Sequence, residues 1–441
     1  MAAPGHGEVV REREASRVYG YTSPRFDAGT VTGPPASRRK PWGPAPGPPG
    51  GGEGRCPHRE TALMVAGAAA VAAAVVALSI AAYLHWPPAM VGGRPTPQGP
   101  VPDGMAWLGA FTWWDGAWYT GIAERGYGFT AGRQSPVAFF PAYPVMVRAL
   151  APVAGSSALS GFAVTLACGL AALVLFHAWA YERAGRRAAR YAFAALALYP
   201  CSFYLFGTVY ADALFLVAAV GAFLLLERDR TVLAGLVAAV GTATRPVGMA
   251  LAVGLWARVA ERRGVLEGGR LDLSRLLARD AGLLLAPLGL VAYAAYLGRR
   301  FGEPLLFIEA EKGWGQSPGW TTWLKLSWFQ EMAAARPLSP PQLHLVGALL
   351  ATAVALGLAV AVFRRLGWGY GVYSLAVVAG SAVSTKNFIG MGRYAMAAFP
   401  CFVVAGLMLA GRKRVGWAVL AVSGVMLVVL SQFHARNMLI S

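Results

Sequence analysis

The 441-residue chain has the composition of a membrane protein. Hydrophobic residues make up 56% of it and charged residues only 14%, against roughly 45–50% and about 25% in soluble proteins. The 39 basic and 21 acidic residues leave a net charge of +18, and the basic residues stand at the ends of apolar blocks. This distribution excludes an ordinary soluble enzyme. It indicates loops held on the cytoplasmic side of a membrane rather than a nucleic-acid-binding surface.

Two regions follow from composition. Residues 1–60 are rich in proline and glycine, and we expect them to form a disordered cytoplasmic tail because they cannot bury a core. Residues 61–441 form the predicted transmembrane domain. Its first apolar block, 61–84, is long enough to cross a bilayer and is followed by a long loop over residues 85–155.

The rest of the chain is a series of apolar blocks. Two of them, 231–244 and 247–260, flank Arg245-Pro246. Each would form about 21 Å of helix, too short to cross, so we predict a re-entrant pair. The pattern predicts an all-α polytopic bundle of about nine full transmembrane helices plus this pair. The remaining predicted spans are 156–180, 188–206, 209–226, 281–297, 343–363, 367–385, 394–410 and 415–432.

Loop charge predicts the orientation. The strongly basic loops all fall on one side of the predicted topology, together with the N-terminus, and the positive-inside rule makes that side the cytoplasm. The long loops 85–155 and 298–342 then face outward, as do the turns near 207–211 and 386–393. The basic loop residues are Arg183, Arg186, Arg187, Arg190, Arg228, Arg230, Arg258, Arg262, Arg263, Arg364, Arg365, Arg412, Lys413 and Arg414.

The first outer loop holds the most distinctive polar residue of the chain. Asp115 stands among Trp113, Trp114, Trp118 and Tyr119, at or just outside the membrane surface. A carboxylate that takes a proton from a hydroxyl needs a fixed, partly dry position, which such rings provide. Two plainer interpretations stay open: the rings are interfacial anchors, and Asp115 caps the helix that follows.

The motifs around Asp115 resemble a known family. The run Trp114-Asp-Gly-Ala-Trp-Tyr-x-x-Ile-Ala-x-x-Gly-Tyr is followed by Ala138-Phe-Phe-Pro-Ala-Tyr-Pro-Val-Met-Val-Arg. Together they resemble the first-loop signature of PIG-V-like mannosyltransferases, the relatives of GPI mannosyltransferase 2 in the GT-C superfamily of membrane glycosyltransferases. Weaker motifs continue the resemblance in order, at Tyr199-Pro-x-Ser-Phe-Tyr with Tyr210-Ala-Asp, at Ala243-Thr-Arg-Pro, and at Gly392-Arg-Tyr. The compact chain favours a prokaryotic member.

The resemblance implies a fold and an activity. It implies a GT-C-like bundle in the plasma membrane that transfers mannose from a polyprenyl (dolichyl-type) phosphate mannose donor. The acceptor is a hydroxyl of a glycolipid or glycan on the outer face, and inversion at the sugar uses Asp115 as general base. The implied partners are the lipid-linked donor, the acceptor and membrane lipids, with no nucleic acid. A phosphate leaving group needs no second catalytic acid, so one carboxylate suffices.

Three basic residues are candidates for binding the donor phosphate. Arg245 lies at a helix break within the membrane, where a charged residue usually marks a site. Lys386 and Arg393 lie in an outer turn, against the charge trend. The alternatives are that Arg245 forms a structural pair and that the other two meet lipid headgroups.

Six residues are candidates for contacting the sugar or the acceptor: Trp114, Trp118, Tyr119, Tyr143, Asp212 and Trp314. Asp212 could instead cap a helix. Trp314 stands with Glu309 and Glu311 in the second outer loop, where a solvated loop is the alternative. No His, Cys, Asp or Glu spacing indicates a bound metal, and dependence on a divalent cation stays open.

Two rival functions remain from the sequence. A GT-C enzyme with another sugar specificity would carry the same features. A non-enzymatic lipid or solute transporter would explain the topology and Arg245, but transporters usually place their polar residues near the midplane between repeats. We find no internal repeat here.

Overall fold

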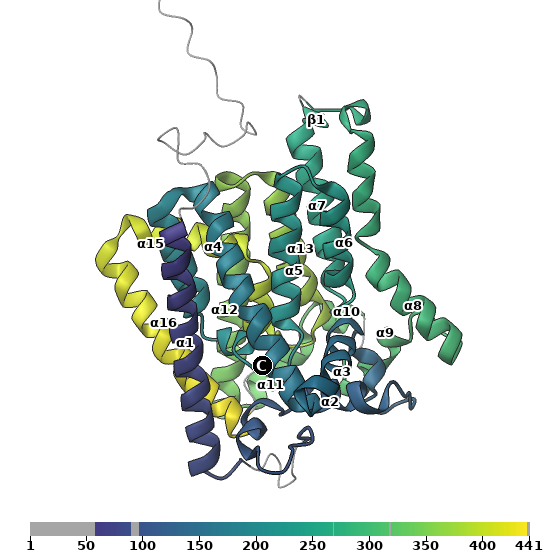
Figure 1. Ribbon diagram of the computed structural model, residues 1–441, viewed down its shortest axis with the longest axis vertical. Helices are drawn as coiled ribbons and strands as arrows, with labels where there is room; N and C mark the ends of the chain where they lie inside the picture. The colour runs from purple at the N-terminus through teal and green to yellow at the C-terminus, as the bar shows by residue number, and fades with distance from the viewer. Residues whose placement is uncertain (1–57, 90–96, 268, 317–318, 439–441) are drawn as a thin grey trace, which may run out of the picture. The chain divides into compact units, whose positions relative to one another are not determined.

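Apolar helices make up nearly all of the regular structure in the computed structural model, which describes residues 58–89, 97–267, 269–316 and 319–438 (Figure 1). The described part confirms the all-α prediction. Its only strands are the two-residue strands β1 (Leu266–Glu267) and β2 (Arg270–Leu271), which form one short hairpin. The predicted tail lies outside the described residues except for 58–60. The helices are α1 (His58–His85), α2 (Asp115–Arg125), α3 (Ala142–Ala154), α4 (Ser157–Ala197), α5 (Asp212–Glu227), α6 (Thr231–Thr242), α7 (Gly248–Arg263), α8 (Leu288–Phe301), α9 (Leu306–Ala310), α10 (Trp320–Trp323), α11 (Leu326–Ala334), α12 (Pro340–Arg365), α13 (Trp368–Ser384), α14 (Met391–Tyr394), α15 (Pro400–Gly411) and α16 (Lys413–Ala435).

Four described helices are long and apolar enough to cross a membrane: α1, α4, α12 and α16. Two bent pairs raise the number to six if each is one span. One joins the 3₁₀ helix η5 (Ala278–Leu285) to α8 with a bend of 40°, and the other joins residues Met391–Ala397 to α15 with a bend of 90°. The predicted count of nine full spans is therefore not confirmed.

Helix α4 combines two predicted spans. It is interrupted by a single non-helical residue, Gly185, with φ 74° and ψ 168°, a region that glycine enters without steric cost. The predicted break between 180 and 188 is thus present. The predicted end at 206 is wrong, because α4 ends at Ala197, just before Pro200, which disfavours helix in the residue that precedes it.

Helices α6 and α7 form a hairpin beside α5. At its open end, the side chains of Arg262 and Arg263 contact Asp229, at 3.1 and 3.2 Å, just after α5. At its turn, Arg245 contacts Asp212, the first residue of α5. Both ends of the hairpin therefore lie at one end of α5 and its turn lies at the other, so the hairpin runs along the whole of α5, which is itself a predicted span. Its re-entrant character stays a prediction.

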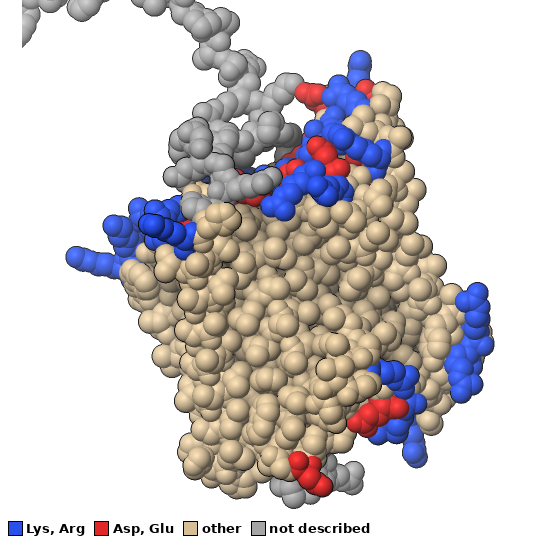
Figure 2. All heavy atoms as spheres, in the orientation of Figure 1, with Lys and Arg blue, Asp and Glu red and all other residues tan. Residues whose placement is uncertain are grey.

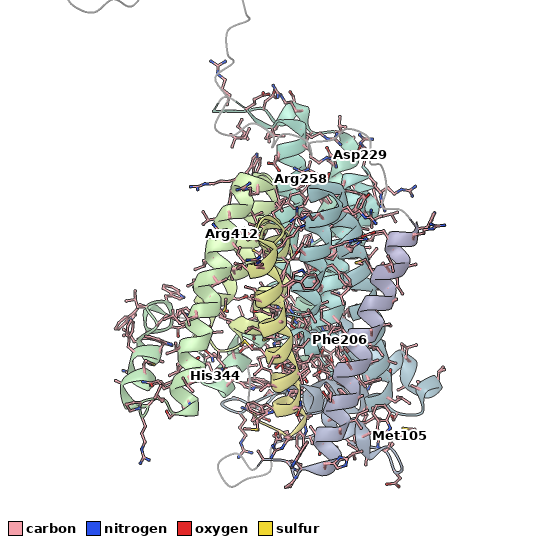
Figure 3. All side chains as sticks on the ribbon, turned by 90° about the vertical axis from the view of Figure 1, so that its left-hand side faces the viewer. Met105, Phe206, Asp229, Arg258, His344 and Arg412 are labelled. Atoms are coloured by element: carbon pink, nitrogen blue, oxygen red, sulfur yellow. The ribbon has the colours of Figure 1, made fainter. Side chains whose placement is uncertain are left out.

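The predicted basic loops gather at one end of the bundle. Figure 3 places Asp229, Arg258 and Arg412 toward one end, Met105 and His344 toward the other, and Phe206 between them. In Figure 2, charged side chains lie mainly at the two ends of the visible face, with a broad uncharged band between them. The side of the membrane that each end faces stays a prediction.

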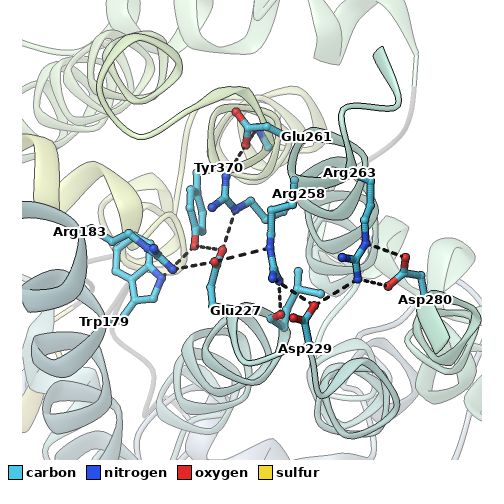
Figure 4. Close-up of polar contacts among 12 residues, drawn as sticks. Trp179, Arg183, Glu227, Asp229, Arg258, Glu261, Arg263, Asp280 and Tyr370 are labelled. Carbon is cyan, nitrogen blue, oxygen red and sulfur yellow. Dashed lines mark hydrogen bonds and ion pairs between the residues drawn. The ribbon is translucent and has the colours of Figure 1, made fainter. Parts of the chain in front are cut away.

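An ion-pair network ties the helices together at the basic end (Figure 4). The Glu227 carboxylate, at the end of α5, accepts from Arg258 at 2.6 Å and from the Tyr370 hydroxyl at 2.7 Å, and pairs with Arg183 at 2.9 Å. These partners come from α7, α13 and α4. Below them, fully buried rings fill the centre of the bundle, among them Trp179, Phe223 and Tyr373. The network joins α5 to α7 at one end, and Asp212 and Arg245 stand at the opposite ends of these two helices.

Candidate active site

Asp115 begins α2, directly after a strained residue. Trp114 has φ 56° and ψ −115°, a region that non-glycine residues rarely occupy and that clusters at functional sites. The Trp114 N–H donates to the Pro97 carbonyl at 3.2 Å, and the Asp115 N–H donates to the Tyr210 hydroxyl at 3.2 Å. Hydrogen bonds from the backbone N–H groups of Trp114 and Asp115 thus hold this strained segment in place.

The Asp115 side chain does not cap the helix. The cap position belongs to Trp114, and no side-chain cap hydrogen bond is present. Instead, an Asp115 carboxylate oxygen accepts from Nη1 of Arg393 at 2.7 Å. The side chain of Asp115 is 28% exposed and that of Arg393 is 12% exposed, so the carboxylate is the more accessible partner of the pair.

The ion pair continues into a chain of alternating charges. Arg393 Nε lies 3.9 Å from a carboxylate oxygen of Asp212, and Nη2 of Arg245 lies 2.8 Å from the same oxygen. Asp212 begins α5 but also makes no cap hydrogen bond. The negative charge of Asp212 is stabilised by the N-terminal end of the α5 helix dipole and by both arginines. Two carboxylates and two guanidinium groups thus form a neutral row, with Asp115 at its more exposed end.

Aromatic rings enclose the two arginines. The Arg393 guanidinium carbon lies 5.4, 5.2 and 5.0 Å from the ring centres of Tyr204, Tyr210 and Tyr394, and that of Arg245 lies 5.4 Å from Phe215. Such contacts stabilise a cation away from water. We did not predict the three tyrosines as site residues, although all three lie within the motifs quoted above.

Three buried polar atoms in this region lack a hydrogen-bond partner. The Nε atoms of Arg245 and Arg393 and the indole nitrogen of Trp114 are buried, and none has a hydrogen-bond partner among the described residues. Buried polar groups are nearly always bonded, to protein, to water or to a ligand. Unused donors on two neighbouring cations favour an anionic ligand with several oxygens.

The outer wall of the site is aromatic. The Trp118 ring stacks on Phe139 at 5.8 Å between centroids, and Trp314, from the 3₁₀ turn η6 (Glu311–Trp314), meets both rings edge-on at 5.6 and 5.7 Å. The structure therefore brings the predicted residues Trp118 and Trp314 together beside Asp115, although they come from two separate loops that we predicted to face outward.

Two predicted contact residues lie behind this wall. Tyr143 is fully buried, and its hydroxyl is occupied by the Gly161 carbonyl at 2.9 Å and by the Thr165 hydroxyl at 2.7 Å. Tyr119 is only 7% exposed, and burial raises the pKa of its hydroxyl well above the usual range. We therefore assign Tyr143 to packing rather than to contact with a sugar, and Tyr119 to the support of Phe139, 5.2 Å away.

Lys386 does not join the row of charges. It lies beside η6, where its backbone N–H donates to the Gln316 side chain at 2.9 Å. Its ammonium forms no ion pair with any residue that the structure describes. Of the three predicted phosphate-binding residues, the structure thus brings Arg245 and Arg393 together and leaves Lys386 outside the row.

A shallow, open apolar recess lies between α3, α6 and α8. It has a volume of about 410 Å³, and its wall includes Ala243, which precedes Arg245 by two residues. The other lining residues are Ala142, Met146, Ala239, Val240, Leu288 and Gly289. Within the described residues, no group of three His, Cys, Asp or Glu side chains is placed to hold a metal ion.

Comparison with known proteins gives two solved structures of similar arrangement. ArnT from Cupriavidus metallidurans, bound to undecaprenyl phosphate, has a TM-score of 0.49 and 14% identity over 85% of this chain and 76% of its own. The oligosaccharyltransferase of Archaeoglobus fulgidus, tethered to an acceptor peptide, has a TM-score of 0.40 and 12% identity over 84% of this chain and 55% of its own. No family model and no curated protein matches the sequence. The likeness is too low to assign a function, which is argued below from the residues themselves.

Proposed function

We propose that this chain is a GT-C-type membrane glycosyltransferase that transfers mannose from a polyprenyl-phosphate mannose donor to a hydroxyl acceptor on the outer face. The observation that carries the proposal is the row Asp115–Arg393–Asp212–Arg245, in which the buried Nε–H of each arginine makes no hydrogen bond. Guanidinium groups bind phosphate with paired, charge-assisted hydrogen bonds, so the row suits a phosphate ligand.

Phosphate binding and release of the base are coupled in this proposal. Arg393 holds the Asp115 carboxylate when no donor is bound. A donor phosphate competes for the same guanidinium, and its arrival frees the lone pairs of Asp115 for an acceptor hydroxyl. Asp212 keeps both arginines oriented throughout, since it contacts both.

The reaction is a direct displacement at the sugar carbon. The acceptor oxygen forms a bond to the anomeric carbon while the bond from that carbon to the phosphate oxygen breaks. The acceptor proton passes to Asp115, and the phosphate leaves with the bonding electrons and stays on the arginines, whose charge stabilises it. Attack opposite the leaving group inverts the anomeric carbon, in agreement with a single base.

The apolar recess supports a lipid-linked donor. One of its lining residues, Ala243, stands two positions before Arg245, and we propose that the isoprenoid chain lies along this apolar surface while its phosphate reaches the arginine. A nucleotide sugar offers no apolar group for such a recess. The choice of mannose rests on the first-loop motif around Asp115, and another sugar on the same carrier is the nearest alternative.

A transfer assay tests the proposal. Purified protein in proteoliposomes is given radiolabelled polyprenyl-phosphate mannose, polyprenyl-phosphate glucose or a nucleotide sugar, together with lipid and alkyl-glycoside acceptors. We expect consumption of the mannose lipid and no consumption of the nucleotide sugar. The test variant is Asp115→Asn, which removes the proposed base. Its matched control is Asp103→Asn, which alters an exposed carboxylate of the same loop.

Two results contradict the proposal. Consumption of the glucose lipid in preference to the mannose lipid contradicts the sugar assignment alone. Movement of the intact lipid across the bilayer without cleavage of its phosphate–sugar bond contradicts enzymatic transfer and favours the transporter.

A further inference from the structure

The 3₁₀ turn η6 is fixed over the outer side of the site. A Cβ atom on Gly313 would lie 2.5 Å from the backbone oxygen of Arg133, so the turn packs directly on the first outer loop. On its other side, the Gln316 side chain accepts from the backbone N–H of Lys386 at 2.9 Å. The Trp314 ring completes the contact with Trp118. The turn is therefore packed against its neighbours on both sides and forms part of the lining of the site.

The spacing of two residue pairs directs Glu311 toward Asp115. Side chains at positions i and i+3 share a face of a 3₁₀ turn, so Glu311 lies on the same face as Trp314. Asp115 and Trp118 share a face of α2 in the same way. Because the rings of Trp118 and Trp314 meet at 5.6 Å, the two acidic side chains stand on facing surfaces.

Glu311 has no partner to explain its position. Its carboxylate makes no hydrogen bond or ion pair with any described residue, and its side chain is half-buried. Burial, and to a smaller degree the negative charge of Asp115, raises the pKa of Glu311 to about 7. The other charged groups on the surrounding segments are Arg133, Lys386, Glu309 and Lys312.

We propose that Glu311 is the second carboxylate of the acceptor site, and that the acceptor is a sugar with two neighbouring hydroxyls. One hydroxyl faces Asp115 and reacts, and its neighbour donates a hydrogen bond to Glu311. The sugar ring packs on the indoles of Trp118 and Trp314, as apolar ring faces do on aromatic surfaces. This inference rests on the proposed function and specifies its acceptor.

The geometry gives Glu311 a role in specificity. A carboxylate that faces an acceptor hydroxyl binds it with a charge-assisted hydrogen bond and is left unpaired by an analogue that lacks the hydroxyl. An acceptor with a single hydroxyl, such as a simple alcohol, is therefore a poor substrate even though it can react at Asp115. We name Glu311 a residue of acceptor recognition, with Asp115 as the base.

The test compares Glu311→Gln with Glu309→Gln, an exposed glutamate two positions earlier. Octyl mannoside, octyl glucoside and octanol serve as acceptors, with polyprenyl-phosphate mannose as donor, and donor breakdown by water is followed in parallel. We expect Glu311→Gln to raise the KM for the alkyl glycosides by about tenfold, the difference between a charged and a neutral hydrogen bond. Donor KM and breakdown by water should stay within twofold, and Glu309→Gln should behave like the unaltered protein.

The pH dependence separates recognition from a structural role. Since Glu311 is a carboxylate only above its folded-state pKa, the glycoside KM of the unaltered protein should rise as pH falls through about 7, and Glu311→Gln should lose that rise. An unchanged glycoside KM in Glu311→Gln overturns the inference, as does equal use of octanol and the glycosides. Donor breakdown by water without transfer to any glycoside also overturns it and leaves the donor half of the proposed function standing. No donor breakdown at all overturns both.

Discussion

At the residue scale, Arg393 has two possible partners: Asp115, 2.7 Å away, and the donor phosphate that we propose. A lysine at this position keeps the charge but loses the planar fork that bonds two oxygens at once. We predict that Arg393→Lys raises donor KM at least about tenfold and lowers transfer further. Steady-state kinetics with the lipid donor checks this, with the exposed Arg133→Lys as control. Unchanged donor KM in Arg393→Lys would remove the phosphate role of this residue.

Asp212 is the most buried member of the row, with its side chain 5% exposed. Removing one partner of a buried ion pair leaves an uncompensated charge, which costs about 3–5 kcal/mol. We predict that Asp212→Ala lowers the melting temperature in detergent clearly, whereas the exposed Asp103→Ala does not. The double variant Asp212→Ala/Arg245→Ala should recover part of the loss. Additive losses in the double variant would contradict the pairing.

The sequence identified the residue types of the site but not their pairing. Asp115 was indicated by the aromatic residues around it, and Asp212 by its place in a family-like motif. Arg245 was indicated by the helix break, and Arg393 by a positive charge against the trend of the loops. Asp115 and Arg393 are 278 positions apart, and no local pattern predicts a contact at that separation. Glu311 was harder to single out, since an acidic residue in an outer loop is ordinarily solvated. Its neighbour Trp314 was the available signal.

At the element scale, the position of Arg245 depends on close packing of α6 against α8. A Cβ atom on Gly289 would lie 2.0 Å from the Ala239 carbonyl oxygen and 2.6 Å from the Ala243 nitrogen. We predict that Gly289→Ala displaces the end of α6, lowers the melting temperature and weakens use of the donor. Gly357, inside α12, has nothing within 4 Å of a Cβ atom, so Gly357→Ala should be neutral or stabilising by up to about 1 kcal/mol. Equal effects of the two substitutions on donor use would contradict this.

Helix ends were less predictable than helix existence. Hydropathy located the apolar block of α4, but only Gly185 and the approach to Pro200 decide where its helical segments stop. The hairpin of α6 and α7 was predictable because Arg245-Pro246 interrupts two runs that are each too short to cross. The turn η6 was not, since its position depends on Gly313 packing against Arg133.

At the scale of the whole molecule, the predicted orientation rests on loop charge alone and has a direct test. In a variant without the four native cysteines, a cysteine in place of Thr130 or Trp320 should react from outside with a membrane-impermeant thiol reagent. A cysteine in place of Arg187 should not. All three positions are exposed in the structure, so access is decided by the membrane. Labelling of position 187 in intact cells would reverse the orientation and with it the case for a lipid-linked donor.

The number of spans could not be fixed from hydropathy. Bent pairs such as residues Met391–Ala397 with α15 contain enough apolar residues for a crossing. Their two helical parts point in different directions, 90° apart. Their packing, which sequence periodicity does not reveal, decides whether they cross. The all-α architecture was predictable because a chain in lipid must satisfy its backbone hydrogen bonds internally.

The most direct measurement of the central claim is transfer by Asp115→Asn, made together with donor affinity. Asparagine keeps the shape of the side chain but cannot take the acceptor proton, and positioned base catalysis is worth about 10²–10⁴-fold. The neutral asparagine also no longer competes with the donor phosphate for the Arg393 guanidinium. We therefore predict a folded protein that binds the lipid donor as tightly as the unaltered protein or more tightly, and transfers at least about a hundredfold more slowly. Near-normal transfer would contradict the account.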